Sequence, residues 1–380
     1  GIMAYEVIES LEPGRPADYA MLTDLYAQNP ATRDKAINRL HAVLANQDKP
    51  LPIIRQLMEL YEKAEDWDAV FVLSEIIAFS EGLDEPQRQR FERLLAESPK
   101  RPQESMRETE WKILLHPDVE NPVGALFAML CRLAPDSLTV PAKRLGLKPR
   151  EEVELEREST PMASLITYGR DIFNLPLVGL YQKRGSMEAL RLCHSQPPAL
   201  VVGEHNELLR QADEPGVRFQ IGRVLAGARP ELFLSSVYGV DELRHILFGL
   251  CAVYNPQVEI DSDPEDVENW QRIFRSLPTR ILQQLQPCAQ EAYRSVRESG
   301  GMGQYCAGVE HTLVRGGFIL GGDLATAARG IQVGLPEGPA FPSKQFVDAL
   351  IKFAASKQYL RLRKSLGLEI KNVDRKTSVA

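Results

Sequence analysis

Two stretches in the first hundred residues repeat one another, and this repeat limits the fold of that part of the chain more than any other feature. The stretch Leu22–Tyr26, followed by Ala36, aligns with Leu57–Tyr61, followed by Ala69. The Leu and Tyr positions are 35 residues apart and the alanines are 33 apart. Because apolar residues recur three and four positions apart, both stretches predict a hairpin of two helices. An ordinary helical domain with chance spacing is the alternative.

This spacing resembles that of tetratricopeptide repeats, which are about 34 residues long, although the Trp-Leu-Gly signature of those repeats is incomplete here. Such repeats stack on their neighbours and form a concave surface. The resemblance implies a protein partner that binds through the helical repeats. Tyr26, Tyr61 and Trp67 are the candidate contacts to that partner.

The length and charge of the chain indicate a globular protein of two or three domains. Its 380 residues, of which 44% are hydrophobic, exceed the needs of one core. The formal charge of −7 argues against a nucleic-acid partner, because such partners require a concentrated basic face. No apolar run approaches the roughly eighteen residues that a membrane-spanning helix requires.

The five cysteines are widely spaced and odd in number, which predicts reduced thiols and a cytoplasmic location. The opening Gly1-Ile2-Met3 suggests residues added before the natural sequence. We therefore expect this chain to be a piece of a larger parent chain or assembly.

A change in composition divides the chain into two expected domains. Residues 141–158 are polar and charged, which predicts a linker between a helical domain at 1–140 and a second domain at 159–380. In the second domain, a helix is expected from Pro161 to Phe173. Three short β-like segments follow at 177–182, 189–194 and 199–202, and the rest is helical. The predicted fold class is α+β, mostly α, with a small antiparallel sheet.

Residues 217–228 are predicted to form a buried helix, because their apolar side chains fall on one stripe. One part of this helix has unusually small side chains, at Gly222, Ala226 and Gly227. Since glycine inside a helix costs roughly 1 kcal/mol relative to alanine, a close neighbouring backbone is expected. Gly316-Gly317 on a later helix is the expected neighbour.

The order of an edge strand at 198–203, the helix at 217–228 and a later helix at 309–317 resembles the catalytic domain of HtpX-type and CAAX-prenyl-protease-type zinc endopeptidases. In that family the first helix carries H-E-x-x-H, in which two histidines bind zinc and the glutamate activates water. The later helix carries a glutamate ligand and, two residues on, an aspartate.

In this sequence the positions that match the family's zinc ligands and catalytic residues hold residues of other types, which neither bind zinc nor activate water. They are, in order, Gly222, Arg223, Ala226, Thr312 and Val314. Arg315 matches the family pattern and is a further candidate binding residue. The chain is also similar to the carboxy-terminal domains of large bacterial tetratricopeptide proteins, in which a G-R-x-L-A-x-x-R-P-E stretch like that at 222–231 recurs. The resemblance therefore implies a degenerate peptidase domain with no zinc, no other cofactor and no hydrolysis.

The predicted function is a non-catalytic scaffold that binds a protein partner. One alternative is a hydrolase with a different site, for which Glu204, His205, Glu310 and His311 are the nearby groups capable of acid–base or metal chemistry. Another is a second half without peptidase ancestry. An antiparallel sheet packed beside the helix at 217–228 would distinguish a peptidase-like second half from a helical domain without peptidase ancestry.

Overall fold

The chain forms two compact units, of which the first combines both ends of the sequence. The first unit consists of residues 1–103 and 348–380, and the second of residues 104–347. The computed structural model describes residues 16–157, 160–176, 178–206, 214–334 and 342–371. The division between the units therefore differs from the expected boundary, because it does not fall at 141–158.

The segment at 141–158 is part of the second unit, in spite of its polar composition. It forms two short 3₁₀ helices, η3 (Ala142–Leu145) and η4 (Pro149–Glu151), followed by strand β1 (Glu152–Val153). β1 pairs with another strand of the second unit, and the Glu151 carboxylate accepts a hydrogen bond from the backbone nitrogen of Lys148 at 3.1 Å. Charged residues here mark a surface segment with fixed structure, and not a linker.

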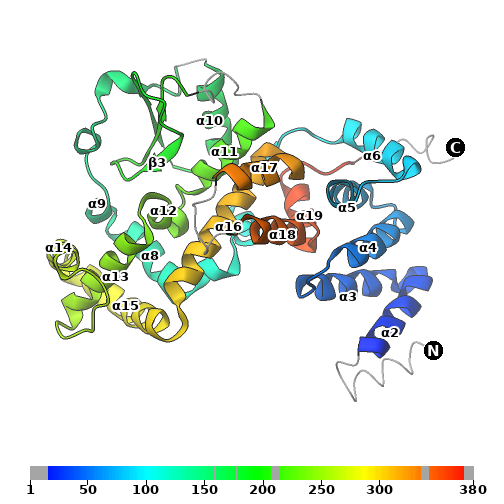
Figure 1. The fold of residues 1–380 in the computed structure, drawn as a ribbon, viewed down its shortest axis with the longest axis horizontal. Coiled ribbons are helices and arrows are strands. Elements are labelled where there is room, and N and C mark those ends of the chain that lie inside the picture. The colour runs from blue at the N-terminus through cyan, green and yellow to red at the C-terminus, as the bar shows by residue number, and fades with distance from the viewer. Residues whose placement is uncertain (1–15, 158–159, 177, 207–213, 335–341, 372–380) are drawn as a thin grey trace. The chain divides into compact units, whose positions relative to one another are not determined.

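The first unit contains a series of helices in which each packs against the next (Figure 1). In chain order they are α2 (Pro16–Gln28), α3 (Arg33–Ala45), α4 (Leu51–Lys63), α5 (Trp67–Ser80) and α6 (Glu85–Glu97), with the short 3₁₀ helix η1 (Pro30–Thr32) before α3. Both predicted helical hairpins are present, as α2 with α3 and α4 with α5. Membership of the tetratricopeptide family stays a prediction.

Local sequence fixes where the later helices of this series begin and end. The Asp66 carboxylate accepts a hydrogen bond from the Ala69 nitrogen at 3.1 Å and caps the start of α5. Asp84 caps α6 and exchanges reciprocal hydrogen bonds with Gln87. Gly82, in the turn between the two helices, has a φ of 86°, which glycine adopts without strain.

A buried ion pair holds α19 (Lys357–Ser365) within the first unit. The Arg363 guanidinium donates through Nη2 to Asp68 Oδ1 at 2.8 Å and through Nε to Oδ2 at 3.1 Å. Arg363 also donates to the Leu368 carbonyl, and Asp68 accepts from the Ile370 nitrogen. The two side chains are only 6% and 7% exposed. Their charges are tolerated there because each is paired and hydrogen-bonded.

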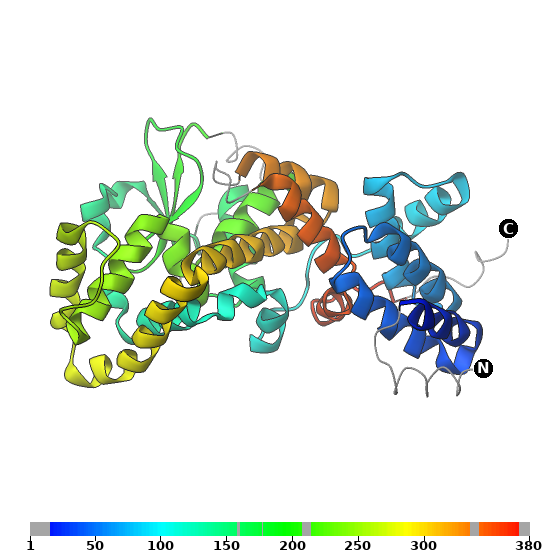
Figure 2. The ribbon, with the colours of Figure 1, turned by 60° about the horizontal axis from the view of Figure 1, so that its bottom comes forward.

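The second unit contains a small sheet and most of the helices of the chain, arranged around α16 (Figure 2). Its helices are α7 (Glu108–Leu114), η2 (Pro117–Glu120), α8 (Pro122–Leu133), α9 (Pro135–Leu138), α10 (Pro161–Ile172), α11 (Pro215–Ala226), α12 (Pro230–Val237), α13 (Val240–Tyr254), α14 (Pro264–Arg275), α15 (Thr279–Ser299), α16 (Gly301–Gly321) and α17 (Leu324–Gly334). The division between the units falls within α18 (Ser343–Ala354). In the described parts of the chain, every helix is too short or too polar to cross a bilayer.

The sheet is mixed, so the expectation of a wholly antiparallel sheet is wrong. Its strand order is β1, β2 (Gly179–Lys183), β4 (Ala199–Gly203) and β3 (Arg191–Cys193). β3 and β4 pair antiparallel, as expected, but β2 and β4 pair parallel. β4 inserts between β2 and β3 because it is the most apolar strand, and the central position buries all five of its residues. The mostly helical α+β class is confirmed.

The Asp68–Arg363 pair generates a prediction about the stability of the first unit. Asp68→Ala leaves a buried guanidinium without its counter-charge, and we expect a loss of roughly 3–5 kcal/mol. Hydrogen exchange in peptides from α5 and α19 measures this loss as faster exchange. The matched control is Arg361→Ala, which removes an exposed arginine from the same helix and should change stability by less than about 0.5 kcal/mol. Equal effects of the two variants contradict the role of the pair.

Candidate functional site

Helix α11 lies at the centre of the second unit and carries the first three positions of the expected degenerate site. It begins with Pro215 at its first turn, where the missing N–H has no helical partner to lose. Phe219 and Ile221 are fully buried. The helix packs against α10, α16 and α17. α11 is therefore a core helix, as its apolar stripe predicts.

The crossing of α11 and α16 is so close that only small residues fit. A β-carbon added at Gly222 would lie 2.7 Å from the Gly316 carbonyl oxygen and 3.1 Å from the Gly317 α-carbon. One added at Gly316 would lie 2.8 Å from the Ala226 β-carbon. Real β-carbons do not make contacts below 3.0 Å without a shift of the neighbour. The expected approach of Gly316-Gly317 to Gly222 is therefore confirmed.

Arg223, at the expected position of the catalytic glutamate, is tied to two neighbouring helices. Its Nη2 donates to the Glu310 carboxylate of α16 at 2.6 Å, and its Nη1 donates to the Gly334 carbonyl at the end of α17. The side chains of Arg223 and Glu310 are 11% and 14% exposed. The pair joins three helices, and it also engages the carboxylate that the hydrolase alternative required.

The later positions of the expected site lie on α16 and have partners of their own. The Thr312 hydroxyl is buried, donates to the Gly308 carbonyl at 2.8 Å and accepts from the His116 nitrogen at 2.9 Å. Val314 is buried as an ordinary core side chain. Arg315 donates from Nη1 to the carbonyls of residues 114 and 115, each at 3.0 Å. Arg223 and Thr312 thus bond to different partners, and none of the five expected positions lines the cavity beside α7 and α8.

Two histidines that the expected site did not pair are stacked in the second unit. The rings of His116 and His311 have centroids 4.6 Å apart, and Phe346 stacks on His311 at 4.1 Å. Burial, followed by the nearby Arg315 guanidinium, lowers the pKa of His116. Burial lowers the pKa of His311 as well, and His116 and Arg315 add to this shift. Both imidazoles are therefore neutral near pH 7.

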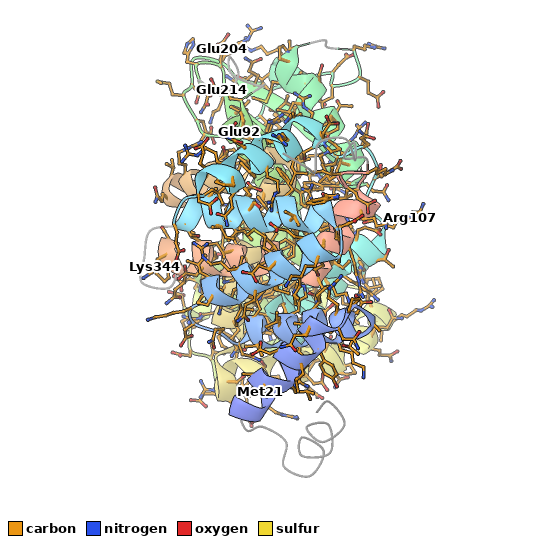
Figure 3. All side chains as sticks on the ribbon, turned by 90° about the vertical axis from the view of Figure 1, so that its right-hand side faces the viewer. Met21, Glu92, Arg107, Glu204, Glu214 and Lys344 are labelled. Carbon is orange, nitrogen blue, oxygen red and sulfur yellow. The ribbon has the colours of Figure 1, made fainter. Side chains whose placement is uncertain are left out.

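The structure does not gather the four residues of the hydrolase alternative. Glu204, labelled in Figure 3, accepts a hydrogen bond from the Gly185 nitrogen at 3.0 Å, and His205 is exposed next to it. Glu310 pairs with Arg223, and His311 stacks between two rings. Within the described ranges, no three His, Cys, Asp or Glu side chains lie close enough together to hold a metal ion.

The candidate partner contacts of the first unit are mostly core residues. Tyr26 is 4% exposed, and the cationic groups of Lys35 and Arg39 lie over its ring. Tyr61 is 6% exposed, and its hydroxyl is 2.8 Å from His41 Nε2. Trp67 is half-buried at the start of α5. Of the three, only Trp67 offers appreciable surface to a partner.

A cavity of about 890 Å³ lies in the second unit, beside α7 and α8. Its apolar wall is formed by Leu115, Val119, Ala125, Ala128, Met129 and Leu133. Its charged groups are Glu108, Lys112, Glu120, Arg132, Arg229 and Glu231. The volume falls in the range of roughly 300–1,000 Å³ that is usual for small-molecule sites.

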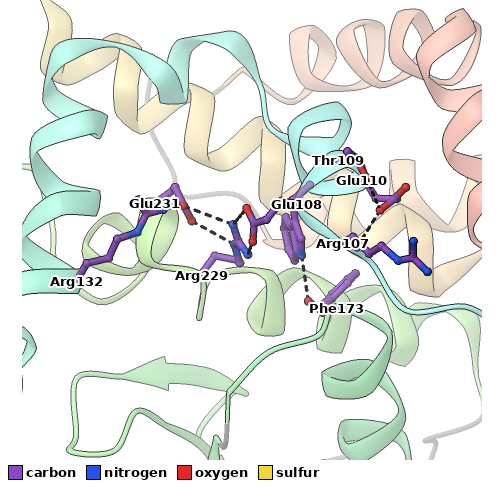
Figure 4. A network of polar contacts seen from close by, with 9 residues as sticks. Arg107, Glu108, Thr109, Glu110, Arg132, Phe173, Arg229 and Glu231 are labelled. Atoms are coloured by element: carbon purple, nitrogen blue, oxygen red, sulfur yellow. Dashed lines mark hydrogen bonds and ion pairs between the residues drawn. The ribbon is translucent and has the colours of Figure 1, made fainter.

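Arg229 organises the charged side of this cavity (Figure 4). Its two Nη atoms donate to the two oxygens of Glu108 at 2.9 and 3.1 Å, and its Nε donates to Glu231 at 3.1 Å. Arg132 also pairs with Glu231. The hydrogen bonds from Arg229 hold the pKa of Glu108 below its usual range. Sequence reasoning missed this cluster, although Arg229 and Glu231 belong to the G-R-x-L-A-x-x-R-P-E stretch.

No family model, curated protein or solved structure matches this chain.

The α11/α16 crossing predicts opposite effects for the same substitution at two positions of one helix. Gly222→Ala should destabilise the second unit by about 1–3 kcal/mol, because its β-carbon meets the Gly316 carbonyl. Gly216→Ala has open space around it and should leave stability unchanged or raise it by up to about 1 kcal/mol. Urea unfolding followed by Trp111 and Trp270 fluorescence, in a Trp67→Phe background, measures both. Equal stability of the two variants contradicts the close approach.

The histidine stack predicts a specific acid sensitivity. Each folded-state pKa lies below the ordinary value near 6.5, so the unfolded chain binds protons first as the pH falls. Stability should be unaffected above about pH 7 and should decrease below about pH 6.5. His311→Phe keeps a flat ring without a titrating group. The variant should reduce the slope between pH 6.5 and 5 by up to roughly 1.4 kcal/mol per pH unit. Urea unfolding at each pH checks this, and an unchanged slope contradicts it.

Proposed function

We propose that this protein is a non-catalytic scaffold that binds a protein partner through the helices of its first unit. The observation that carries the proposal is the sequential packing of α2 to α6, because series of this kind offer extended binding surfaces. Large apolar side chains are exposed on three of these helices. They are Met21, Phe79 and Leu95, of which Met21 is labelled in Figure 3.

The non-catalytic part of the proposal includes descent of the second unit from a peptidase-like domain. The support is the filled crossing at Gly222, where an imidazole in place of the glycine would collide with the Gly316 carbonyl. Arg223 is bonded to Glu310, and a permanently charged guanidinium is a poor proton acceptor. The close packing of α11 on α16 thus fills the space that a metal and its ligands would need at these positions.

The proposal also includes a cytoplasmic location and a partner that is not a nucleic acid. All five cysteines are free thiols, which suits a reducing compartment. The net charge of −7 opposes attraction to a phosphate backbone.

Binding through the first unit predicts which surface substitution removes the partner. Met21→Asp with Leu95→Asp places charge on two exposed apolar positions of the helical series, and we expect at least a tenfold loss of the captured partner. The control is Met187→Asp, which alters a 73% exposed methionine in the second unit and should leave capture unchanged. Cross-linked capture from the native host, quantified by mass spectrometry, compares the variants. A loss with Met187→Asp alone contradicts the assignment to the first unit.

The proposed absence of catalysis is tested separately on the purified chain. Elemental analysis should find less than about 0.1 zinc per chain after dialysis against micromolar zinc. Stoichiometric zinc that is lost when Arg223 or Glu310 is substituted contradicts the proposal that the protein is non-catalytic.

A further inference from the structure

The two partners of the Arg229–Glu108 ion pair are unequally fixed in the cavity wall. The Arg229 side chain is 11% exposed, whereas that of Glu108 is 74% exposed. The arginine is therefore a built part of the wall, and the glutamate reaches it from solvent. An exposed carboxylate of this kind contributes little to stability and exchanges readily with another anion.

Contacts on its inner side hold the Arg229 guanidinium in place. It lies 4.8 Å from the centroid of the Trp111 ring, and Trp111 Nε1 donates to the Phe173 carbonyl at 3.0 Å. Nε of Arg229 donates to Glu231, which is 15% exposed. These contacts fix the planar fork of Arg229, so its two outward Nη atoms form a prepared site for a carboxylate (Figure 4).

We propose that this cavity binds a carboxylate attached to an apolar chain, and that the ligand's carboxylate takes the place of Glu108 on Arg229. The ligand oxygens would accept the same two hydrogen bonds that Glu108 now accepts. The site goes beyond the scaffold function and does not depend on it, because every residue involved belongs to the second unit.

A cationic ligand fits the same geometry less well. A cation that drew Glu108 away from Arg229 would leave Nη1 without an acceptor. Because the Arg229 side chain is only 11% exposed, an N–H that loses its acceptor has little access to water, which carries a cost. A carboxylate avoids this cost because it keeps the guanidinium paired throughout.

The displaced Glu108 has an alternative partner on its own helix. Lys112 lies one helical turn further along α7, lines the same cavity, and is exposed. A glutamate four residues before a lysine is a favourable helical pair. Displacement of Glu108 therefore exchanges one surface ion pair for another.

The apolar wall suits a flexible chain behind the carboxylate. The wall residues on α8 include Met129, whose unbranched side chain adapts to ligands of different shape. The volume of about 890 Å³ holds an acyl chain or a few apolar residues at a peptide terminus. A fatty acid and an apolar peptide terminus both have a terminal carboxylate attached to an apolar chain.

Isothermal titration calorimetry on the full chain tests the proposal with octanoate and octanol as probes. We expect octanoate to bind at least tenfold more tightly than octanol. Glu108→Gln removes the internal competitor and should tighten octanoate binding several-fold while leaving octanol unchanged. Glu120→Gln, which removes another exposed carboxylate of the same cavity, is the matched control and should change neither affinity.

Arg229→Lys keeps the charge but loses the two-pronged geometry, and it should weaken octanoate binding at least tenfold. Because this variant perturbs a packed arginine, the Glu108→Gln result carries the test if Arg229→Lys fails to fold. Equal affinity for octanoate and octanol, no binding of octanoate up to 10 mM, or weaker octanoate binding by Glu108→Gln would overturn the proposal.

A second arm of the same experiment distinguishes the two sources of ligand. A five-residue peptide ending in Leu-Leu is titrated with a free and with an amidated carboxy terminus. Binding of the free form alone, tightened by Glu108→Gln, extends the site to chain termini. Binding of octanoate without the peptide restricts it to small acids. Equal binding of both peptide forms, together with equal binding of octanoate and octanol, defeats the carboxylate assignment.

Discussion

The second unit depends on the close approach of α11 and α16, and this approach depends on the absence of side chains. Gly222, Gly316 and Ala226 let one helix rest on the backbone of the other. Glycine in a helix costs roughly 1 kcal/mol, and the packing that it permits must exceed this cost. Polar groups around the crossing then fix the neighbours of these helices. Arg223 joins α11 to α16 and α17, and Thr312 joins α16 to the segment that contains His116.

The packing of this helix pair and the chemistry of its side chains are separate matters. The five positions expected from the sequence to form a degenerate zinc site lie on α11 and α16, which do pack together. Their side chains, however, engage different partners, and the space between the helices is filled. The cavity with the richer chemistry lies beside α7 and α8, where a buried tryptophan and a largely buried arginine support an exposed glutamate.

Features set by neighbouring residues could be predicted from the sequence, and features set by distant ones could not. Thr160 and Pro161 place the start of α10, and the small residues at 222 and 316 predict their own approach. The position of β4 between β2 and β3 makes the sheet mixed, and local patterns do not reveal which strands become neighbours. Arg229 and Glu108 are 121 residues apart in the chain, and neither lies in a sequence motif that predicts contact with the other. The same holds for Asp68 and Arg363, 295 residues apart.

The Asp68–Arg363 pair also determines the order in which the chain can be completed. The helices at 16–97 are synthesised before the second unit, but the arginine that neutralises Asp68 is made only after the whole second unit. Until then, Asp68 must stay hydrated, and the α5 surface that α19 later covers must stay open. The first unit therefore reaches its final form only after the second unit has been made, although most of its sequence precedes that unit. A nascent chain that stalls before residue 363 exposes an unfinished helical series to chaperones and proteases.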